Sequence, residues 1–222
     1  MKIKKIFILV DNPNSWFIKH AKTLKKKIER LKINCQFVTN EKKLTTTADI
    51  CFYLSCTKMT KIKTLAKFKK NIVVHGSNLP KGRGHAPWAW SILAGKNSID
   101  LSLFEIDLKN NQPDSGSVYL RDNFTLKGTE LLNEVRNIIA NRIIYLCVKF
   151  LKNYNKIKPE KQKGKATYFR MRKPKDQKLD VNKSILSQFN ILRTADNKRW
   201  PAFFIYKKNK YLLKIKKQLV IE

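Results

Sequence analysis

The chain has 222 residues, with 48 Lys and Arg against 16 Asp and Glu and a formal net charge of +32. At 42% hydrophobic residues it can bury a core, which excludes a chain disordered throughout, and no apolar run reaches the roughly 18 residues of a membrane span. The basic start at residues 2–5 precedes only a short apolar run with no small-residue cleavage site, so we expect a cytoplasmic protein without a signal peptide.

The positive charge has two interpretations. Excess Lys and Arg attract polyanions, either nucleic acid or a phosphate-bearing small molecule, but lysines are spread along the whole chain and few arginines accompany them. Charge alone therefore does not predict a nucleic-acid partner. The four cysteines form no CxxC pair and only three histidines are present, so we expect free thiols and no metal site.

The first part of the chain alternates strand and helix patterns. Apolar runs predict strands at 6–10, 35–39, 48–54 and 71–75, and helical spacing predicts helices over 16–32 and 58–70. This alternation predicts an α/β fold with an open, mostly parallel, Rossmann-like sheet. Ligands of such sheets bind beyond the carboxyl ends of the strands, so chemistry is expected next to Val10, Leu54 and His75.

The rest of the chain shows a loop, a long helix and a small appendage. A Gly- and Pro-rich loop at 76–87 precedes a helix over 88–93, strands over 99–106 and 117–120, and a helix over 129–154. The Lys-rich segment 155–166 is interpreted as a polar linker. It divides a first domain, 1–154, from a small C-terminal unit, 167–222, with a helix starting at Asp180 and a hairpin of strands 202–206 and 211–215.

One pattern is far more specific than the others. Residues 75–87 contain H-x-S-x-L-P-x-x-R-G-x-x-P, and Pro113-Asp114-Ser115-Gly116 contains a D-x-G turn. Together they resemble the folate-dependent formyltransferase family, which includes methionyl-tRNA formyltransferase and the sugar-nucleotide N-formyltransferases. The resemblance is strong over 71–120 and makes 1–154 the expected catalytic domain. Leu192-Arg193 and residues 200–204 are similar to the short C-terminal element of the sugar enzymes.

The resemblance implies transfer of a formyl group from N10-formyltetrahydrofolate to an amine through a tetrahedral oxyanion. This reaction needs a proton acceptor, a group that orients it and a donor to the oxyanion. His75 is the expected acceptor because His titrates near neutrality, and Asp114 is expected to orient it. The family has an Asn where this chain has Val73. Because Asn71 lies too far along the strand, either Asn78 or backbone donors replace it, or activity is reduced or lost.

Further candidate residues lie at the expected strand ends and in the motif. Cofactor binding is expected from residues at the strand ends and beside the acidic turn: Leu54, Ser55, Leu79 and Pro113. Substrate binding is expected from the loop after the first strand and from basic and aromatic residues of the motif: Asn12, Trp16, Lys81, Arg83 and Trp88.

The amine that accepts the formyl group is left open between three hypotheses. The favoured one is a nucleotide-linked amino sugar, such as a 4-amino-4,6-dideoxy sugar of lipopolysaccharide or O-antigen biosynthesis, because a diphosphate requires basic partners. Methionyl-tRNA fits the basic charge, but segment 167–222 is too short for a five-stranded barrel. An inactive basic binding module is the third hypothesis, supported by Val73. An isolated hairpin is marginally stable, so it is expected to pack on the first domain or on a second subunit. The resemblance to the sugar enzymes implies a homodimer through the C-terminal unit.

Overall fold

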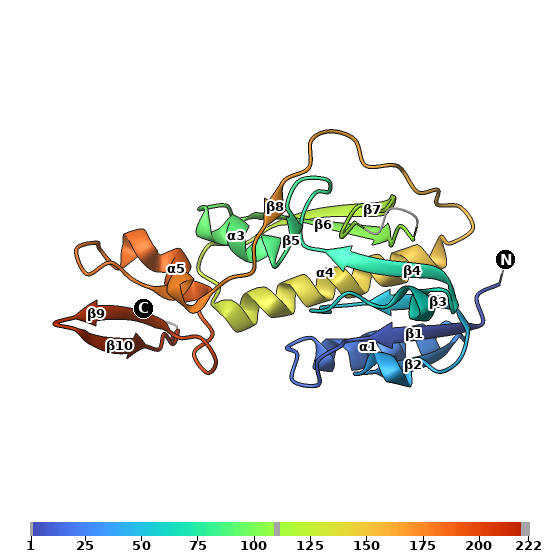
Figure 1. Cartoon of the computed structure of the whole chain (residues 1–222), viewed down its shortest axis with the longest axis horizontal. Coiled ribbons are helices and arrows are strands. Elements are labelled where there is room, and N and C mark those ends of the chain that lie inside the picture. The colour runs from blue at the N-terminus through green and yellow to red at the C-terminus, as the bar shows by residue number, and fades with distance from the viewer. Residues whose placement is uncertain (1, 109–111, 219–222) are drawn as a thin grey trace.

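The computed structural model describes residues 2–108 and 112–218. Its centre is a six-stranded sheet in the order β2-β1-β3-β4-β6-β7 (Figure 1). The parallel strands are β1 (Lys5–Leu9), β2 (Asn34–Val38), β3 (Ala48–Tyr53) and β4 (Phe68–His75). The antiparallel strands are β6 (Ser98–Glu105) and β7 (Val118–Thr125). The predicted mostly parallel α/β sheet is confirmed.

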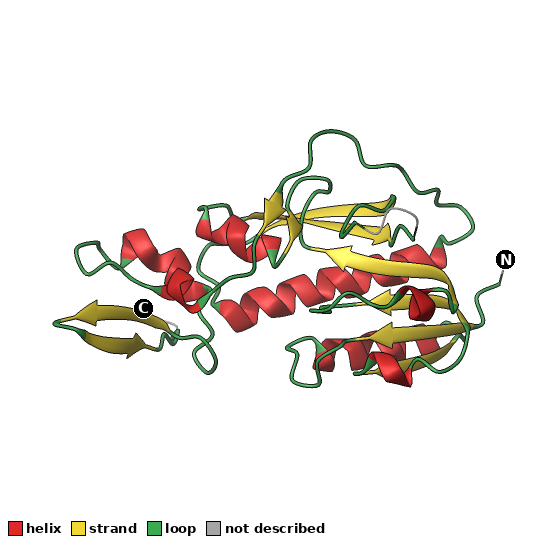
Figure 2. Cartoon of the chain, in the orientation of Figure 1, coloured by secondary structure: helices red, strands yellow, loops and turns green. Residues whose placement is uncertain are grey.

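Alternate side chains of the strands enter two separate cores. Ile6 and Ile8 of β1 pack with helices α1 (Ile18–Glu29) and α4 (Leu132–Lys152) on one face of the sheet (Figure 2). Phe7 and Leu9 of the same strand join a smaller cluster on the other face. Successive strand residues point to opposite faces, so a run of apolar residues in β1 requires cover on both sides.

The helix predicted over 58–70 is much shorter in the structure. Only α2 (Ile62–Leu65) forms, and Phe68 already belongs to β4, where it pairs with Ala48 of β3. The spacing of Ile62, Leu65 and Phe68 fits a helix, but Ile62 is exposed and Phe68 packs beside Leu65 as a strand residue. Tertiary pairing with β3 therefore overrides the local helical pattern.

The Gly- and Pro-rich residues 76–86, which carry the motif, form a loop that we call the motif loop. A short helix, α3 (Pro87–Leu93), follows it and packs against β6. Before it lies a two-residue strand, β5 (Arg83–Gly84). None of the helices among residues 2–108 and 112–218 is long and apolar enough to cross a membrane.

The C-terminal unit differs from the prediction in its helix and agrees with it in its hairpin. In place of a helix starting at Asp180, a turn and a 3₁₀ helix (Leu186–Gln188) lead into the short α5 (Phe189–Arg193). Strands β9 (Ala202–Tyr206) and β10 (Asn209–Leu213) pair antiparallel. The connecting Lys207 and Lys208 have φ of 44° and 66°, the positive values of a type I′ turn.

The C-terminal unit contacts the N-terminal part of α4, the loop before it and Asn97, which directly precedes β6. The Arg193 side chain is fully buried and donates to Asn97 Oδ1 at 3.0 Å, with Glu130 4.0 Å away. Arg136 of α4 pairs with Asp196 at 3.1 Å. The division into domains 1–154 and 167–222 stays a prediction, and residues 1 and 219–222 at its limits lie outside the described residues.

The segment interpreted as a linker runs back across the first domain. From the end of α4 it arches along the β6–β7 side of the sheet and reaches β8 (Tyr168–Phe169), as Figure 1 shows. Glu160 exchanges two backbone hydrogen bonds with Val118 of β7, each 2.8 Å long. Strand β8 pairs in parallel with β5. The segment therefore connects the two units while contacting the motif loop and the acidic turn.

Candidate active site

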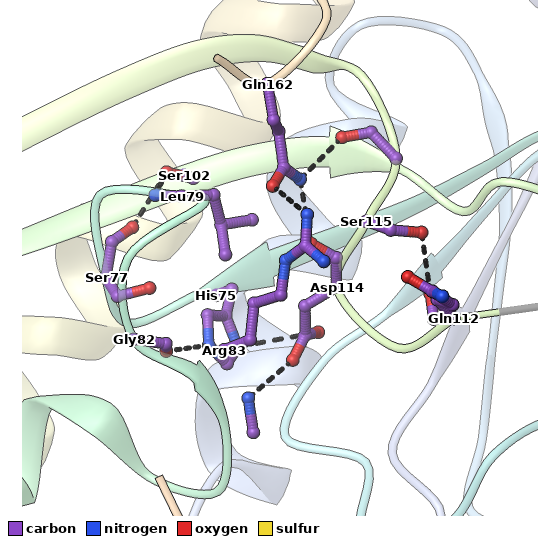
Figure 3. A network of polar contacts seen from close by, with 12 residues as sticks. His75, Ser77, Leu79, Gly82, Arg83, Ser102, Gln112, Asp114, Ser115 and Gln162 are labelled. Atoms are coloured by element: carbon purple, nitrogen blue, oxygen red, sulfur yellow. Dashed lines mark hydrogen bonds and ion pairs between the residues drawn. The ribbon is translucent and has the colours of Figure 1, made fainter. Parts of the chain in front are cut away.

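His75 ends β4 at the carboxyl edge of the parallel strands, and both of its ring nitrogens face polar groups. Nε2 lies 2.9 Å from the carbonyl oxygen of Gly82, and Nδ1 lies 3.8 Å from Oδ1 of Asp114 (Figure 3). A carbonyl only accepts hydrogen bonds, so Nε2 carries the proton in the neutral ring. The side chain of His75 is 11% exposed and that of Asp114 is 17% exposed, which reduces the screening of their interaction by water.

Asp114 belongs to a tight turn whose backbone is specialised. Its φ is 56°, in the left-handed region, and its Oδ2 accepts a 2.8 Å hydrogen bond from the backbone N–H of Gly84. A Cβ on Gly116 would lie 1.5 Å from the carbonyl oxygen of Glu105, so only glycine fits there. The D-x-G pattern therefore has a steric cause at its glycine, which lets the turn press against β6.

Ser102 of β6 forms two hydrogen bonds with the backbone of the motif loop. The Ser102 hydroxyl donates to the Ser77 carbonyl at 2.7 Å and accepts from the Leu79 N–H at 3.2 Å, as Figure 3 shows. Gly76 lies so close to Trp88 that an added Cβ would come within 2.9 Å of Cδ1. These contacts fix the loop that presents the Gly82 carbonyl to His75.

This arrangement can take up a proton at one defined atom. With Nε2–H bound to Gly82, the lone pair of Nδ1 is the acceptor that remains on His75. Protonation there produces an imidazolium facing the Asp114 carboxylate, and the two opposite charges attract in a partly buried environment. The site can therefore act as a general base and stabilise the cation that results.

The position of the family asparagine is apolar in this chain. Val73 packs against a cluster that includes Leu79 and Phe104. Asn71 is buried, accepts from the Tyr53 hydroxyl at 2.9 Å and donates to a backbone carbonyl, so its amide is committed to the fold. Asn78 is exposed on the motif loop. Its role as an oxyanion donor stays a prediction.

The four candidates for cofactor binding lie in different environments. Leu54 and Leu79 are buried, so contact between these side chains and a ligand requires neighbouring residues to move. Ser55 has a φ of 54°, and its hydroxyl lies 3.2 Å from that of Ser15 in the loop after β1. Pro113 is exposed beside Asp114. The structure thus leaves Ser55 and Pro113 as the accessible members of this set.

Two of the five candidates for substrate binding lie in the loop after β1, and both already have protein partners. The side chain of Asn12 accepts from the Asn14 N–H at 2.8 Å, which closes the loop. Trp16 lies under the Arg136 guanidinium, 5.9 Å from its ring centroid. In the motif loop, Lys81 is exposed and Trp88 packs against the main core.

The fifth candidate, Arg83, is buried and turned toward the predicted linker. Its Nη2 donates to Gln162 at 2.7 Å and its Nη1 donates to the Tyr168 hydroxyl at 3.2 Å. Sequence reasoning missed Gln162 and its neighbours because Lys, Pro and Gly in 155–166 indicate an exposed linker. The one local signal was the β-type run Thr167-Tyr168-Phe169, which follows Gly164.

Arginines from the C-terminal unit and α4 gather beside the loop after β1. Arg199 donates to the carbonyl of Asn14, and Arg136 lies over Trp16. Burial lowers the pKa of Arg172, although Asp176 opposes this, and the nearby charge of Arg136 lowers it further. Such mutual repulsion between guanidinium groups is relieved by an anion.

Burial is the main influence on the cysteine thiols of the chain. Burial raises the pKa of the Cys35 and Cys56 thiols to about 12, which keeps them protonated, and all four cysteines are free. Within the part of the chain that the structure describes, no three His, Cys, Asp or Glu side chains are grouped to hold a metal ion.

Comparison with known proteins gives both sequence and structural relationships. No protein-family model matches the chain. Over 140 residues, 62% of the chain, it is 30% identical to methionyl-tRNA formyltransferase from Clostridium beijerinckii, and the match covers 44% of that relative. The chain thus spans less than half the length of this curated relative.

The fold matches solved structures over nearly the whole chain. Methionyl-tRNA formyltransferase from Clostridium thermocellum matches with a TM-score of 0.79 and 24% identity, over 98% of this chain and 94% of that one. HypX from Aquifex aeolicus in complex with tetrahydrofolic acid has a TM-score of 0.78 and 14% identity, over 97% and 38%. A 4-N formyltransferase from Francisella tularensis has a TM-score of 0.71 and 16% identity, over 98% and 99%. Over the aligned 140 residues the chain is thus similar in sequence to a methionyl-tRNA formyltransferase, and over nearly its whole length it shares the fold of solved formyltransferase structures.

Proposed function

We propose that this chain is an N-formyltransferase that moves a formyl group from N10-formyltetrahydrofolate to the amine of a nucleotide-linked amino sugar. The observation that carries the proposal is the His75–Asp114 pair at the carboxyl edge of the sheet, with Nδ1 and Oδ1 3.8 Å apart. General bases that act near neutral pH are most often histidines oriented by a second group.

The chain's own residues supply the proton chemistry. The folate, when bound, supplies the formyl carbon that the amine attacks. His75 takes the proton of the attacking amine at Nδ1 while Nε2–H stays bound to the Gly82 carbonyl. Asp114 stabilises the resulting imidazolium, and His75 would return the proton to the folate nitrogen N10 as its bond to the formyl carbon breaks and tetrahydrofolate leaves. Asn78, or backbone N–H groups of the motif loop, would donate to the negative charge that develops on the formyl oxygen.

The site offers polar groups that fit a folate head group. The Ser77 hydroxyl is buried and lacks a hydrogen-bond partner within the described residues, in the loop that follows His75. Ser55 holds a strained backbone conformation at the end of β3 and carries a hydroxyl on the same edge of the sheet. Unsatisfied buried donors and strained residues cluster at ligand sites.

One observation supports a sugar nucleotide as the acceptor. The arginines beside the loop after β1 provide positive charge for a diphosphate, and Trp16 lies in the same loop. The solved 4-N formyltransferase matches over 98% of this chain and 99% of that one, and the solved methionyl-tRNA formyltransferase over 98% and 94%, so coverage of the fold does not separate the two acceptor classes.

Methionyl-tRNA is the second candidate acceptor. Its support is the 30% identity with the C. beijerinckii relative and the net charge of +32. A tRNA bound through several phosphates loses affinity steeply with salt, whereas a single diphosphate gives a shallow dependence.

The test is an activity screen with both acceptor classes. The purified chain is incubated with N10-formyltetrahydrofolate and either a panel of amino-sugar nucleotides or methionyl-tRNA. Tetrahydrofolate release and a formyl mass gain on the acceptor are measured at several salt concentrations. We expect turnover with an amino-sugar nucleotide, and loss of turnover in His75→Asn and Asp114→Asn.

Each alternative has its own signature in this screen. Turnover with methionyl-tRNA alone would replace the sugar acceptor. Folate binding without turnover on any acceptor would support an inactive module. Turnover that survives both substitutions would remove His75 and Asp114 from the mechanism.

A further inference from the structure

The segment that sequence analysis interprets as a linker contributes a side chain to the candidate site. Gln162 donates through Nε2 to the carbonyl oxygens of Asp114, at 2.7 Å, and Gly116, at 2.8 Å. Its Oε1 accepts from Nη2 of Arg83 at 2.7 Å. Figure 3 shows the Gln162 amide between the acidic turn and the Arg83 side chain.

These contacts complete a closed ring of interactions that includes His75. From His75 the ring runs to the Gly82 carbonyl, along the backbone to Arg83, through its guanidinium to Gln162, and from Gln162 to the Asp114 turn. It closes where Asp114 faces Nδ1 of His75. A second tie crosses the ring, because Gly84 donates its N–H to the Asp114 carboxylate.

We propose that Gln162 is a positioning residue for the His75–Asp114 pair, through which the crossing segment sets the place of the Asp114 carboxylate. This inference rests on the proposed function for its catalytic meaning. Its structural claim does not depend on that function: the protonation and surroundings of the His75 ring nitrogens depend on Gln162.

The chemistry of the amide makes the assignment specific to glutamine. Two carbonyl oxygens require an N–H donor group, and the Arg83 guanidinium requires an acceptor, so only a side-chain amide satisfies both sides. Asp114 has a φ of 56°, a conformation that a non-glycine residue keeps only when its surroundings enforce it. The paired bonds from Gln162 to both ends of this turn provide that constraint.

Two substitutions separate positioning from simple attachment of the segment. Gln162→Glu keeps an acceptor for Arg83, with added charge, but turns a carboxylate toward the two carbonyls of the turn. Gln162→Leu removes both functions at similar size. Lys163→Gln is the matched control, because Lys163 is the exposed next residue.

The kinetic measurement is kcat and KM for both substrates of formyl transfer. We expect kcat to fall about 100-fold in Gln162→Glu and in Gln162→Leu, with KM within a factor of about three, since small misplacements of catalytic groups cost that much. Lys163→Gln should match the unaltered protein. If Gln162 only attached the segment through Arg83, Gln162→Glu would keep full kcat, and that result would overturn the proposal.

A second measurement needs no activity. Long-range ¹H–¹⁵N spectra of the apo protein report the protonation of each imidazole, and with three histidines His75 is assigned by its loss in His75→Asn. We expect the His75 ring nitrogens to shift in both Gln162 variants and not in Lys163→Gln. Unchanged His75 signals in folded Gln162→Glu would overturn the proposal even if no acceptor were turned over. Failure of the proposed function would instead appear as absent turnover in the unaltered protein.

Discussion

The backbone N–H of Gly84 donates to Oδ2 of Asp114 at 2.8 Å, which leaves Oδ1 to face Nδ1 of His75. The carboxylate therefore has one oxygen bound to the motif loop and the other directed at the His75 ring. Its position depends on the loop as much as on its own turn.

Asp114→Asn tests the charge at this position with little change in shape. The amide oxygen can still accept from Gly84, but the imidazolium of His75 loses its counter-charge. We expect kcat for formyl transfer to fall by about 10²–10⁴, with little change in KM, because general-base catalysis contributes about that much. Asp100→Asn, on β6, is a control that should keep its kcat.

Asn78→Ala tests the candidate oxyanion donor. Asn78 is exposed on the motif loop, so its truncation should leave the unfolding midpoint unchanged. Removing one such donor costs about 10²–10³ in kcat. An unchanged kcat would assign the oxyanion contact to backbone donors instead.

Arg193→Met tests how the C-terminal unit is attached. The substitution keeps much of the apolar stem but leaves Asn97 and Glu130 without a buried cation. Because Glu130 also accepts from the N–H groups of Lys127 and Gly128, we expect a loss near the low end for a broken buried pair, about 3 kcal/mol. Urea denaturation measures it. Arg30→Met, at an exposed site, should shift the midpoint little.

Phe150→Ala tests the core beneath α4. Phe150 is fully buried and makes edge-to-face contacts with Phe52 and Tyr119, at centroid distances of 6.3 and 5.0 Å. Its truncation should cost about 3–5 kcal/mol of unfolding free energy. Tyr145→Ala, on the exposed side of the same helix, should cost less than about 1 kcal/mol. Similar losses in both variants would contradict the assigned packing.

The Arg170–Asp176 pair predicts a pH dependence of stability. The Arg170 guanidinium, against some opposing desolvation, holds the pKa of Asp176 at about 2, with help from the Lys173 N–H. A lowered pKa in the folded state adds stability that is present above about pH 4 and is lost as the pH falls toward 2. Asp176→Asn should therefore be less stable than the unaltered protein at pH 5–7, and the difference should shrink by pH 2. Urea midpoints across this range measure it, and a constant difference would contradict the pairing.

Prediction from the sequence succeeded where a signal is local and repeated. Continuous apolar runs such as Ile6–Val10 require burial on both faces, which predicts parallel strands under helices. His75 and Asp114 are predicted as the acid–base pair because the residues around them resemble the formyltransferase motif and its D-x-G turn. The prediction of a helix over 58–70 was wrong. Its three apolar residues at helical spacing also fit one turn of helix followed by the start of a strand, and the pairing of Phe68 with Ala48 favours the strand.

By itself, the sequence determined most of the order of strands and helices and the two cores that its strands require, since each depends on neighbouring residues. Through its motif it also made His75 and Asp114 the predicted acid–base pair. Only the tertiary structure decided which atoms of His75 are engaged and that Gln162 reaches the Asp114 turn. The physical reason is that hydrogen bonds between segments far apart in the sequence form only when the packing of helices and strands brings those segments together. A Lys-rich segment such as 155–166 has the same composition whether it is a solvent-exposed linker or packs beside a site, and no local pattern distinguishes these two cases.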